Sequence, residues 1–326
     1  MTTRNELLQS ITDPSPINPF AVSYLQLCQL SYLLPSDAIP SQVATLSPLN
    51  PGGYWQCSWG PATDDDLSNL AFVATYYYGP NLPVLAAVVL RGTDIDVDSD
   101  LGIIEQIYED MDVLNQSPLP WDLNGPALIA NGTLDALTDI QSLNFEGQGL
   151  VDYLSGFLGD PANHNPVLVV TGHSLGGCLV SVVAPWLQFA LAQENITVPI
   201  VPCSFAGPSA GNADFAEYFQ NTFGYSMRYH NSLDVAPYAW SNLSAIENIY
   251  DPDGLPTPDL AWDAIYAFEG AMELAGVNYA QPSPDSPLTG QFSPGLDWYG
   301  EVYLQHHTAT YMALLGGTTV AAGARR

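Results

Sequence analysis

Ser174 stands between two glycines, Gly172 and Gly176, in the segment TGHSLGGC. The β-prone residues 167–171 before it do not alternate in polarity, which predicts a strand buried on both faces, and the apolar segment from Leu175 predicts a helix. A serine at such a sharp strand-to-helix turn can act as a nucleophile, because flanking glycines let the two elements approach without Cβ clashes. The alternative is a glycine-rich turn whose serine only caps the helix.

A nucleophilic serine needs a histidine as general base, and the chain holds five histidines. In a strand, turn and helix of this kind the order along the chain is serine, acid, histidine. This order excludes the histidines at positions 164 and 173, and it excludes His230, which precedes any acid at the end of a downstream strand. His306 and His307 remain as candidate bases.

Asp234 is the first candidate for the acid. It follows the β-type run Tyr225–His230, so we expect it in a loop at the carboxyl end of a strand. A carboxylate there can fix the tautomer of the histidine and stabilise its imidazolium form. Later acids, Asp251, Asp253 and Asp259, satisfy the chain order too, so order alone leaves the choice open.

The elements around these residues predict an α/β protein whose ligands lie at the carboxyl ends of its strands. We expect one domain over residues 1–326, with a frayed tail at 318–326. The predicted strands are 54–59, 70–78, 84–91, 167–171, 198–207, 225–231 and 244–250, and the predicted helices include 21–34 and one helical stretch over 129–159.

The composition excludes several classes of partner. The net charge is −29 because the chain has five arginines and no lysine, so binding to nucleic acids or anionic membranes is disfavoured. The sequence shows no evident signal peptide and no long apolar run, although secretion stays open and we assign no compartment. The four cysteines lack metal-ligand spacing, and Cys178 and Cys203 are expected to be buried thiols.

An acidic stretch at residues 94–111 has two interpretations. Asp94, Asp96, Asp98, Asp100 and Glu105 occupy positions 1, 3, 5, 7 and 12 of a calcium loop, but Ser99 stands where that loop needs glycine. The following residues carry an amphipathic helical pattern. We therefore predict a lid over 94–111, with an ordinary surface helix and a calcium loop as alternatives.

Four sequence blocks in a fixed order resemble the class 3 (fungal-type) triacylglycerol lipases, a family of α/β-hydrolases. The blocks are VVLRGTD, VVTGHSLGGCLVS, SFAGPSAGNADFA with RYHNSLDVAP, and QHHTATYMALL. The resemblance implies an α/β-hydrolase fold, with a mostly parallel central sheet flanked by helices and a helical lid. It implies no metal and no organic cofactor.

The resemblance also implies roles for single residues. The implied site consists of the triad Ser174, Asp234 and His306 and of two oxyanion-hole residues, Thr93 and Leu175. Family members often carry a histidine five residues before a tyrosine, here Tyr311, which favours His306 over His307. The implied reaction is hydrolysis of acylglycerols or related carboxylic esters through an acyl-enzyme, with possible contact at a neutral lipid interface. Alternatives are a short-acyl or feruloyl-type esterase, a phospholipase A1, an acyltransferase, and an inactive lipid-binding hydrolase fold. The oligomeric state is not predicted.

The two interior arginines, Arg91 and Arg228, both stand in these blocks. Interior cations in a chain so poor in basic residues are expected to be paired. We predict a buried structural ion pair for each, with Asp112 as a candidate partner of Arg91.

Overall fold

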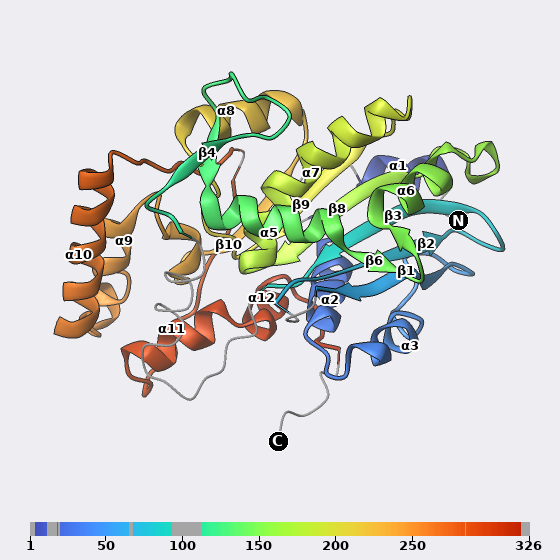
Figure 1. Ribbon diagram of the computed structural model, residues 1–326. Helices are drawn as coiled ribbons and strands as arrows, with labels where there is room; N and C mark the ends of the chain where they lie inside the picture. The colour runs from blue at the N-terminus through green and yellow to red at the C-terminus, as the bar shows by residue number, and fades with distance from the viewer. Residues whose placement is uncertain are drawn as a thin grey trace.

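A seven-stranded sheet forms the centre of the protein (Figure 1). The computed structural model describes residues 4–11, 18, 20–64, 68–92, 112–283 and 285–320. In spatial order the strands are β1 (Tyr54–Thr63), β2 (Leu70–Tyr77), β3 (Pro83–Leu90), β8 (Val167–His173), β9 (Ile200–Phe205), β10 (Met227–Asn231) and β11 (Ser286–Leu288). The β1–β2 and β2–β3 pairs are antiparallel, and the other four pairs are parallel. The predicted mostly parallel α/β fold is therefore confirmed.

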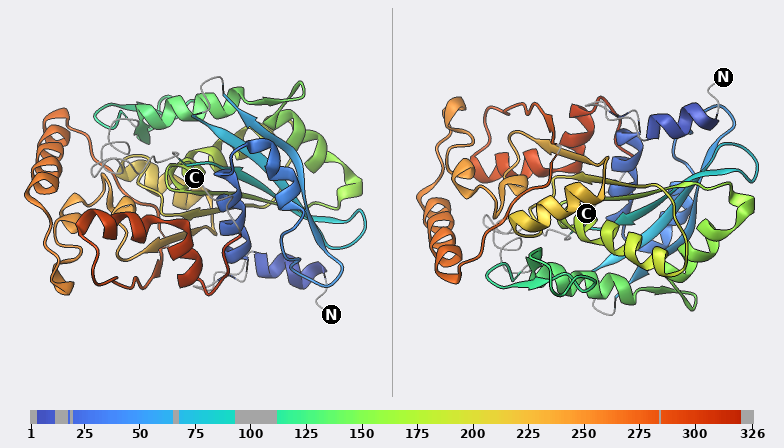
Figure 2. Two further views of the ribbon diagram at one scale, coloured as in Figure 1. Left: turned by 90° about the horizontal axis from the view of Figure 1, so that it is seen from below. Right: turned by 90° about the horizontal axis from the view of Figure 1, so that it is seen from above.

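Helices cover both faces of this sheet. One layer contains α5 (Asn131–Ser142), α6 (Leu150–Gly159), α7 (Leu175–Gln193) and α8 (Ala213–Thr222), and the other contains α1 (Arg4–Ile11), α2 (Ala21–Ser31), α3 (Ile39–Val43) and α12 (Thr308–Leu314). Figure 2 shows α9 (Leu243–Glu247), α10 (Asp259–Ala275) and α11 (Trp298–His306) together at one end of the molecule. The described residues also form two short strand pairs, which are β4 (Gln116–Pro118) with β5 (Leu128–Ala130) and β6 (Asn144–Phe145) with β7 (Gln148–Gly149). The remaining elements are short 3-10 turns: η1 (Ser36–Ala38), η2 (Pro161–Asn163), η3 (Ala236–Tyr238) and η4 (Asp251–Asp253).

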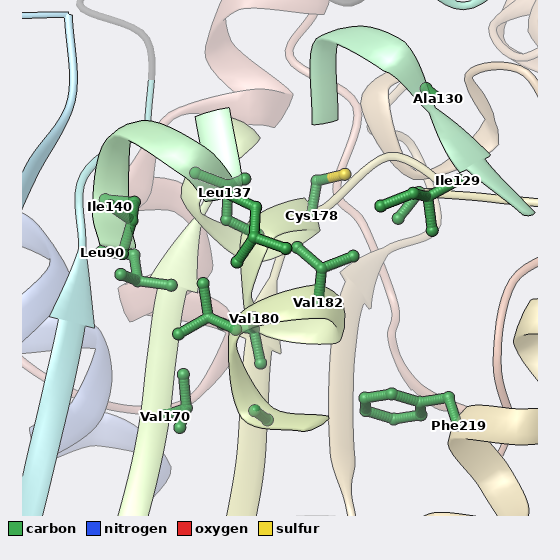
Figure 3. Close-up of a cluster of buried hydrophobic side chains, with 14 of the residues drawn as sticks. Leu90, Ile129, Ala130, Leu137, Ile140, Val170, Cys178, Val180, Val182 and Phe219 are labelled. Carbon is green, nitrogen blue, oxygen red and sulfur yellow. The ribbon is translucent and has the colours of Figure 1, made fainter. Parts of the chain in front are cut away.

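The central strand β8 is buried along its whole length. Leu168 and Val170 face the layer of α5 and α7. Figure 3 shows Val170 beside Val180 of α7. Val167 and Val169 face the layer of α2. Both faces of the strand are thus covered by apolar side chains, which explains why its sequence does not alternate.

Helix α7 is the one helix in the described ranges that is long and apolar enough to cross a membrane by length and composition. Its sequence contains no uninterrupted apolar run of that length, because Ser181, Pro185 and Gln188 interrupt it. Most of α7 is buried against β8, β9 and neighbouring helices. Its composition is therefore that of a core helix in an α/β protein.

Two predicted elements are wrong. Residues 244–250 were expected as a strand but contain most of α9, whose Leu243 and Ile246 are buried at helical spacing; the edge strand is β11 instead. The helical stretch over 129–159 is divided into α5 and α6 by the β6–β7 hairpin. Its turn residues Glu146 and Gly147 both have positive φ, and Gly147 N–H donates to Asn144 Oδ1 at 2.8 Å.

Several sequence predictions fall outside the described residues. They are Thr93, the lid at 94–111 with its calcium-loop alternative, and residues 321–326 of the tail. In the described part of the tail, Gln26 Nε2 donates to the Thr318 carbonyl at 3.0 Å and Val320 N–H donates to Gln29 Oε1 at 3.3 Å. These bonds connect residues 318–320 to α2.

Candidate active site

Ser174 occupies the turn between β8 and α7 with φ 60° and ψ −129°. A non-glycine residue in such a conformation costs of order 1–3 kcal/mol, so the surrounding contacts must hold it there. Ser174 N–H donates to the Phe205 carbonyl of β9 at 3.0 Å. A Cβ on Gly172 would collide with the Gly176 backbone. The turn therefore needs glycine at 172, as the spacing of the motif predicts.

Ser174, His306 and Asp234 lie in one hydrogen-bonded line. The Ser174 Oγ to His306 Nε2 distance is 2.8 Å, and His306 Nδ1 lies 2.9 Å from Asp234 Oδ2 and 3.1 Å from Oδ1. Because an ionised carboxylate only accepts, Nδ1 carries the proton, and Nε2 is left to accept from the serine hydroxyl. This is the tautomer that general-base catalysis requires.

The Asp234 carboxylate is fully buried but well supplied with donors. Ala236 N–H donates to Oδ1 at 3.0 Å, and the Tyr311 hydroxyl donates to Oδ2 at 2.6 Å. Burial first, and the charge of Asp234 next, raise the pKa of Tyr311 well above its usual value, so the hydroxyl keeps its proton. Tyr311 also accepts from Asn231 N–H at 3.0 Å, which ties it to the end of β10.

The backbone of His306 is held by a second histidine. His173 Nε2 lies 2.9 Å from the His306 carbonyl, and His173 Nδ1 lies 3.2 Å from the Tyr32 hydroxyl. Burial first, and the neighbouring His306 next, lower the pKa of His173 well below its usual value. His173 is therefore neutral, with Nε2–H donating to the carbonyl and Nδ1 accepting. The sequence excluded His173 as the base and contained no signal for this supporting contact.

A buried polar network joins the loop that carries Asp234 to helix α11. Asn231 Nδ2 donates to Gln305 Oε1 at 2.7 Å and to the Gln305 carbonyl at 2.9 Å. Gln305 Nε2 donates in turn to Glu301 Oε1 at 2.7 Å, and Ser293 N–H donates to the same oxygen at 2.9 Å. Glu301 is fully buried. The sequence analysis missed these side chains because no local pattern marks them.

The amide of Leu175 is available for an oxyanion hole. Leu175 is the first residue of α7, and the first N–H groups of a helix have no intrahelical acceptor. Gly92, at the end of β3, lies against this turn, since an added Cβ there would be 3.1 Å from Ser174 Cβ. The other predicted donor, Thr93, is next in the chain but lies outside the described residues.

The alternative site residues lie elsewhere. His307 is exposed and accepts from Ala309 N–H at 3.0 Å at the start of α12. The acids Asp251, Asp253 and Asp259 are exposed. The structure therefore brings His306 to Ser174 and leaves His307 at the surface.

Arg228 forms an ion pair, but the pair is not buried as predicted, because the side chains of Arg228 and Asp285 are 16% and 41% exposed. Arg228 Nη2 lies 2.9 Å from Asp285 Oδ1, which also contacts His230 Nδ1 at 2.8 Å. Arg91 is buried as expected, and its pairing with the exposed Asp112 stays a prediction.

All four cysteines are free thiols, and Cys178 and Cys203 are buried as predicted. Within the described ranges, no group of three or more histidine, cysteine, aspartate or glutamate residues is arranged to hold a metal ion.

Comparisons with known proteins agree with this fold. Residues 88–242, which include Ser174 and Asp234 but not His306, match the family "Lipase (class 3)". A segment of 109 residues is 30% identical to lipase ZK262.3 of Caenorhabditis elegans, and the match covers 30% of each protein. The fold is similar to the crystal structure of M37 lipase, with a TM-score of 0.73 and 25% identity over 90% of this chain and 91% of that one.

Proposed function

Because residues 88–242 belong to the class 3 lipase family of α/β-hydrolases, we propose that the protein is a serine carboxylester hydrolase with Ser174, His306 and Asp234 as its triad. One observation carries the proposal: the 2.8 Å contact between Ser174 Oγ and His306 Nε2, with the buried Asp234 carboxylate behind Nδ1. A glycine-rich turn whose serine only capped a helix would need neither contact.

The residue geometry supports a two-step mechanism. His306 Nε2 takes the proton of Ser174 as Oγ attacks the ester carbonyl, and Asp234 stabilises the imidazolium that forms. His306 then gives this proton to the leaving alcohol, and an acyl-enzyme remains. Water, deprotonated by the same nitrogen, then attacks the acyl-enzyme. His306 Nε2 gives this proton back to Ser174 Oγ as the acyl–oxygen bond breaks, which releases the carboxylic acid and restores the free serine.

Charge on the tetrahedral intermediate needs donors other than the triad. The Leu175 amide at the start of α7 is one, aided by the positive end of the helix dipole. Thr93, which sequence resemblance assigns as the second donor, remains a prediction. Loss of one such donor typically lowers kcat by about a hundredfold or more.

Uncharged, water-insoluble acylglycerols are the substrate class we propose. The net charge of −29 disfavours approach to anionic lipids. Both relatives named above are described as lipases. Shorter soluble esters are the second candidate, because the described residues of the triad would act on them equally well.

A panel of p-nitrophenyl esters of increasing acyl length tests both parts of the proposal. The parent protein should hydrolyse them, and Ser174→Ala should lower kcat by at least about a thousandfold. A fluorophosphonate should label Ser174 in the parent but not in the variant. A preference for esters with long acyl chains supports a lipase, and a preference for acetate or butyrate esters supports an esterase. A parent protein that is neither labelled nor active would contradict the proposed hydrolase and leave only a lipid-binding role.

A further inference from the structure

Tyr32 reaches the proposed site from outside the residues that match the family. It is the C-cap residue of α2, and the family match covers residues 88–242. The Tyr32 hydroxyl lies 3.2 Å from His173 Nδ1 and 3.3 Å from the His173 carbonyl. Because His173 directly precedes Ser174 in the chain, this hydroxyl contacts the turn that carries the proposed nucleophile.

The hydrogen bonds of His173 have one direction. A carbonyl oxygen only accepts, so His173 Nε2 carries the hydrogen that meets the His306 carbonyl at 2.9 Å. Because burial lowers the pKa of His173, its imidazole is neutral and its Nδ1 carries no hydrogen. The Tyr32 hydroxyl is then the donor to Nδ1. Tyr32, His173 and the His306 carbonyl therefore form a chain of two hydrogen bonds.

This chain ends on the backbone of the proposed base. His306 is the last residue of α11, and the last carbonyls of a helix have no intrahelical donor. The bond from His173 thus satisfies a carbonyl at the helix end from which the His306 ring extends to Ser174. The two imidazole rings also lie against each other, with centroids 4.9 Å apart. A displacement of His173 would therefore move His306 relative to Ser174 Oγ.

Helix α2 is a firm support for Tyr32. Most of its residues are buried, and Figure 1 shows it beside α12. Cys28 Sγ lies 3.5 Å from Thr171 Oγ1 of β8, and Gln29 Nε2 donates to Thr308 Oγ1 of α12 at 3.4 Å. The helix is thus connected both to the strand that precedes Ser174 and to the helix that follows His306.

A further contact places the Tyr32 hydroxyl close to the nucleophile itself. A Cβ on Gly92 would collide with this hydroxyl and with the His173 carbonyl, and it would lie 3.1 Å from Ser174 Cβ. The hydroxyl and Ser174 therefore border the same short piece of backbone after β3. A hydroxyl at this place could act through His173 or directly on a substrate, and an experiment must separate the two.

We propose that Tyr32 is a positioning residue of the triad: its hydroxyl holds the His173 ring, and His173 holds the backbone of His306. This deepens the proposed function, on which it rests for the role of His306 as the base. Without the hydroxyl, Nδ1 loses its donor from α2, and a buried acceptor without a donor favours movement of the ring. The His306 carbonyl moves with that ring, and so does the base.

Tyr32→Phe keeps the aromatic ring and removes only the hydroxyl. On a soluble p-nitrophenyl ester it should lower kcat about tenfold and change KM by less than about twofold, because the hydroxyl acts on the geometry of the triad and not on substrate binding. Circular dichroism and urea unfolding verify that the assayed variant is folded. An unchanged kcat in folded Tyr32→Phe would overturn the proposal.

A double-mutant cycle with His173→Gln tests whether Tyr32 acts through His173. The glutamine amide keeps a donor toward the His306 carbonyl but offers no acceptor at the position of Nδ1. Adding Tyr32→Phe to His173→Gln should therefore lower kcat by less than about a further twofold. If the two losses multiply instead, Tyr32 acts independently of His173, as a direct contact with the substrate would, and the proposal is wrong.

Tyr76→Phe is the matched control. The Tyr76 hydroxyl also has two partners, since it donates to Asn50 Oδ1 at 2.6 Å and accepts from Asn50 N–H at 2.9 Å. Tyr76 pairs with Leu85 near the start of β3, whereas Gly92 follows the end of that strand. The control should keep the kcat of the parent. A loss equal to that of Tyr32→Phe would show that any buried tyrosine hydroxyl matters, and the specific role of Tyr32 would be refuted.

Heteronuclear NMR of protein with labelled histidine rings reports on the chain without an activity assay. The His173 signals are identified by their absence from the spectrum of His173→Gln. Near neutral pH, His173 should carry its proton on Nε2, and Tyr32→Phe should shift the Nδ1 resonance because its donor is lost. A proton on Nδ1 in the parent would overturn the proposal.

Failure of the proposed function gives a different result. A parent protein that neither cleaves esters nor reacts with a fluorophosphonate would refute the hydrolase and, with it, the role of Tyr32 in catalysis. An active parent with an unaffected Tyr32→Phe variant would refute the role of Tyr32 alone.

Discussion

His173 should make the stability of the protein depend on pH in a way that a single substitution removes. Burial, and then the proximity of His306, lower the pKa of His173 well below its usual value of about 6.5. The unfolded chain therefore binds a proton at this residue below about pH 6.5 that the folded protein does not bind. Stability is retained above that pH and falls as the pH decreases below it.

The expected magnitude follows from one proton. With the folded histidine still neutral at pH 5.5, the parent should lose about 1.4 kcal/mol of unfolding free energy at His173 between pH 7.5 and pH 5.5. His173→Gln has no such proton to bind, and its amide can still donate toward the His306 carbonyl. All other titrating groups are shared, so the variant should lose about 1.4 kcal/mol less than the parent over this interval.

Urea unfolding at the two pH values, followed by far-ultraviolet circular dichroism, measures this difference. A lower absolute stability of His173→Gln at both pH values does not affect the comparison, which uses only the change between them. If parent and variant lose the same unfolding free energy between the two pH values, His173 titrates normally in the folded protein. The assignment of His173 as a neutral donor to the His306 carbonyl would then be wrong.

Three other substitutions test the surroundings of the site. Tyr311→Phe removes a donor from the Asp234 carboxylate and should lower kcat/KM by about ten- to a hundredfold, with KM nearly unchanged, because a hydrogen bond to a charged group contributes about 1.5–3 kcal/mol. Tyr279→Phe is the control: it removes a hydroxyl that donates to the Val113 carbonyl, away from the triad, and should leave kcat/KM and KM unchanged. An equal loss of kcat/KM in the two variants would contradict a specific role for Tyr311. Glu301→Leu should lower the unfolding free energy by about 3 kcal/mol in urea titrations, because Gln305 Nε2 and Ser293 N–H lose their shared acceptor. An unchanged unfolding free energy would show that the network contributes little to stability. Arg228→Met removes the pair with the partly exposed Asp285 and should lower stability by about 1 kcal/mol or less with kcat/KM unchanged, so a large loss of activity would place Arg228 in the site instead.

The turn around Ser174 could be predicted because every feature that defines it is local. A buried strand, two glycines and an apolar helix follow one another within a short segment, and their physical requirements do not depend on distant residues. The same holds for the parallel sheet, since strands buried on both faces carry uninterrupted apolar runs. The prediction of a strand at residues 244–250 was wrong because their apolar positions are compatible with a short helix as well as with a strand. Packing against neighbouring helices selects the helix.

By itself, the sequence determined which residue types could do the chemistry and their order along the chain. It left two adjacent histidines and several acids as candidates, and motif resemblance alone favoured His306 and Asp234. Only the tertiary structure decided which groups meet: His306 lies 132 positions from Ser174 and 72 from Asp234. No local pattern encodes a contact across such separations. The supporting roles of His173, Tyr311 and the buried Gln305 network also arise only when β8, β10, α11 and α12 pack together. A buried polar group must find its partner wherever the fold brings one.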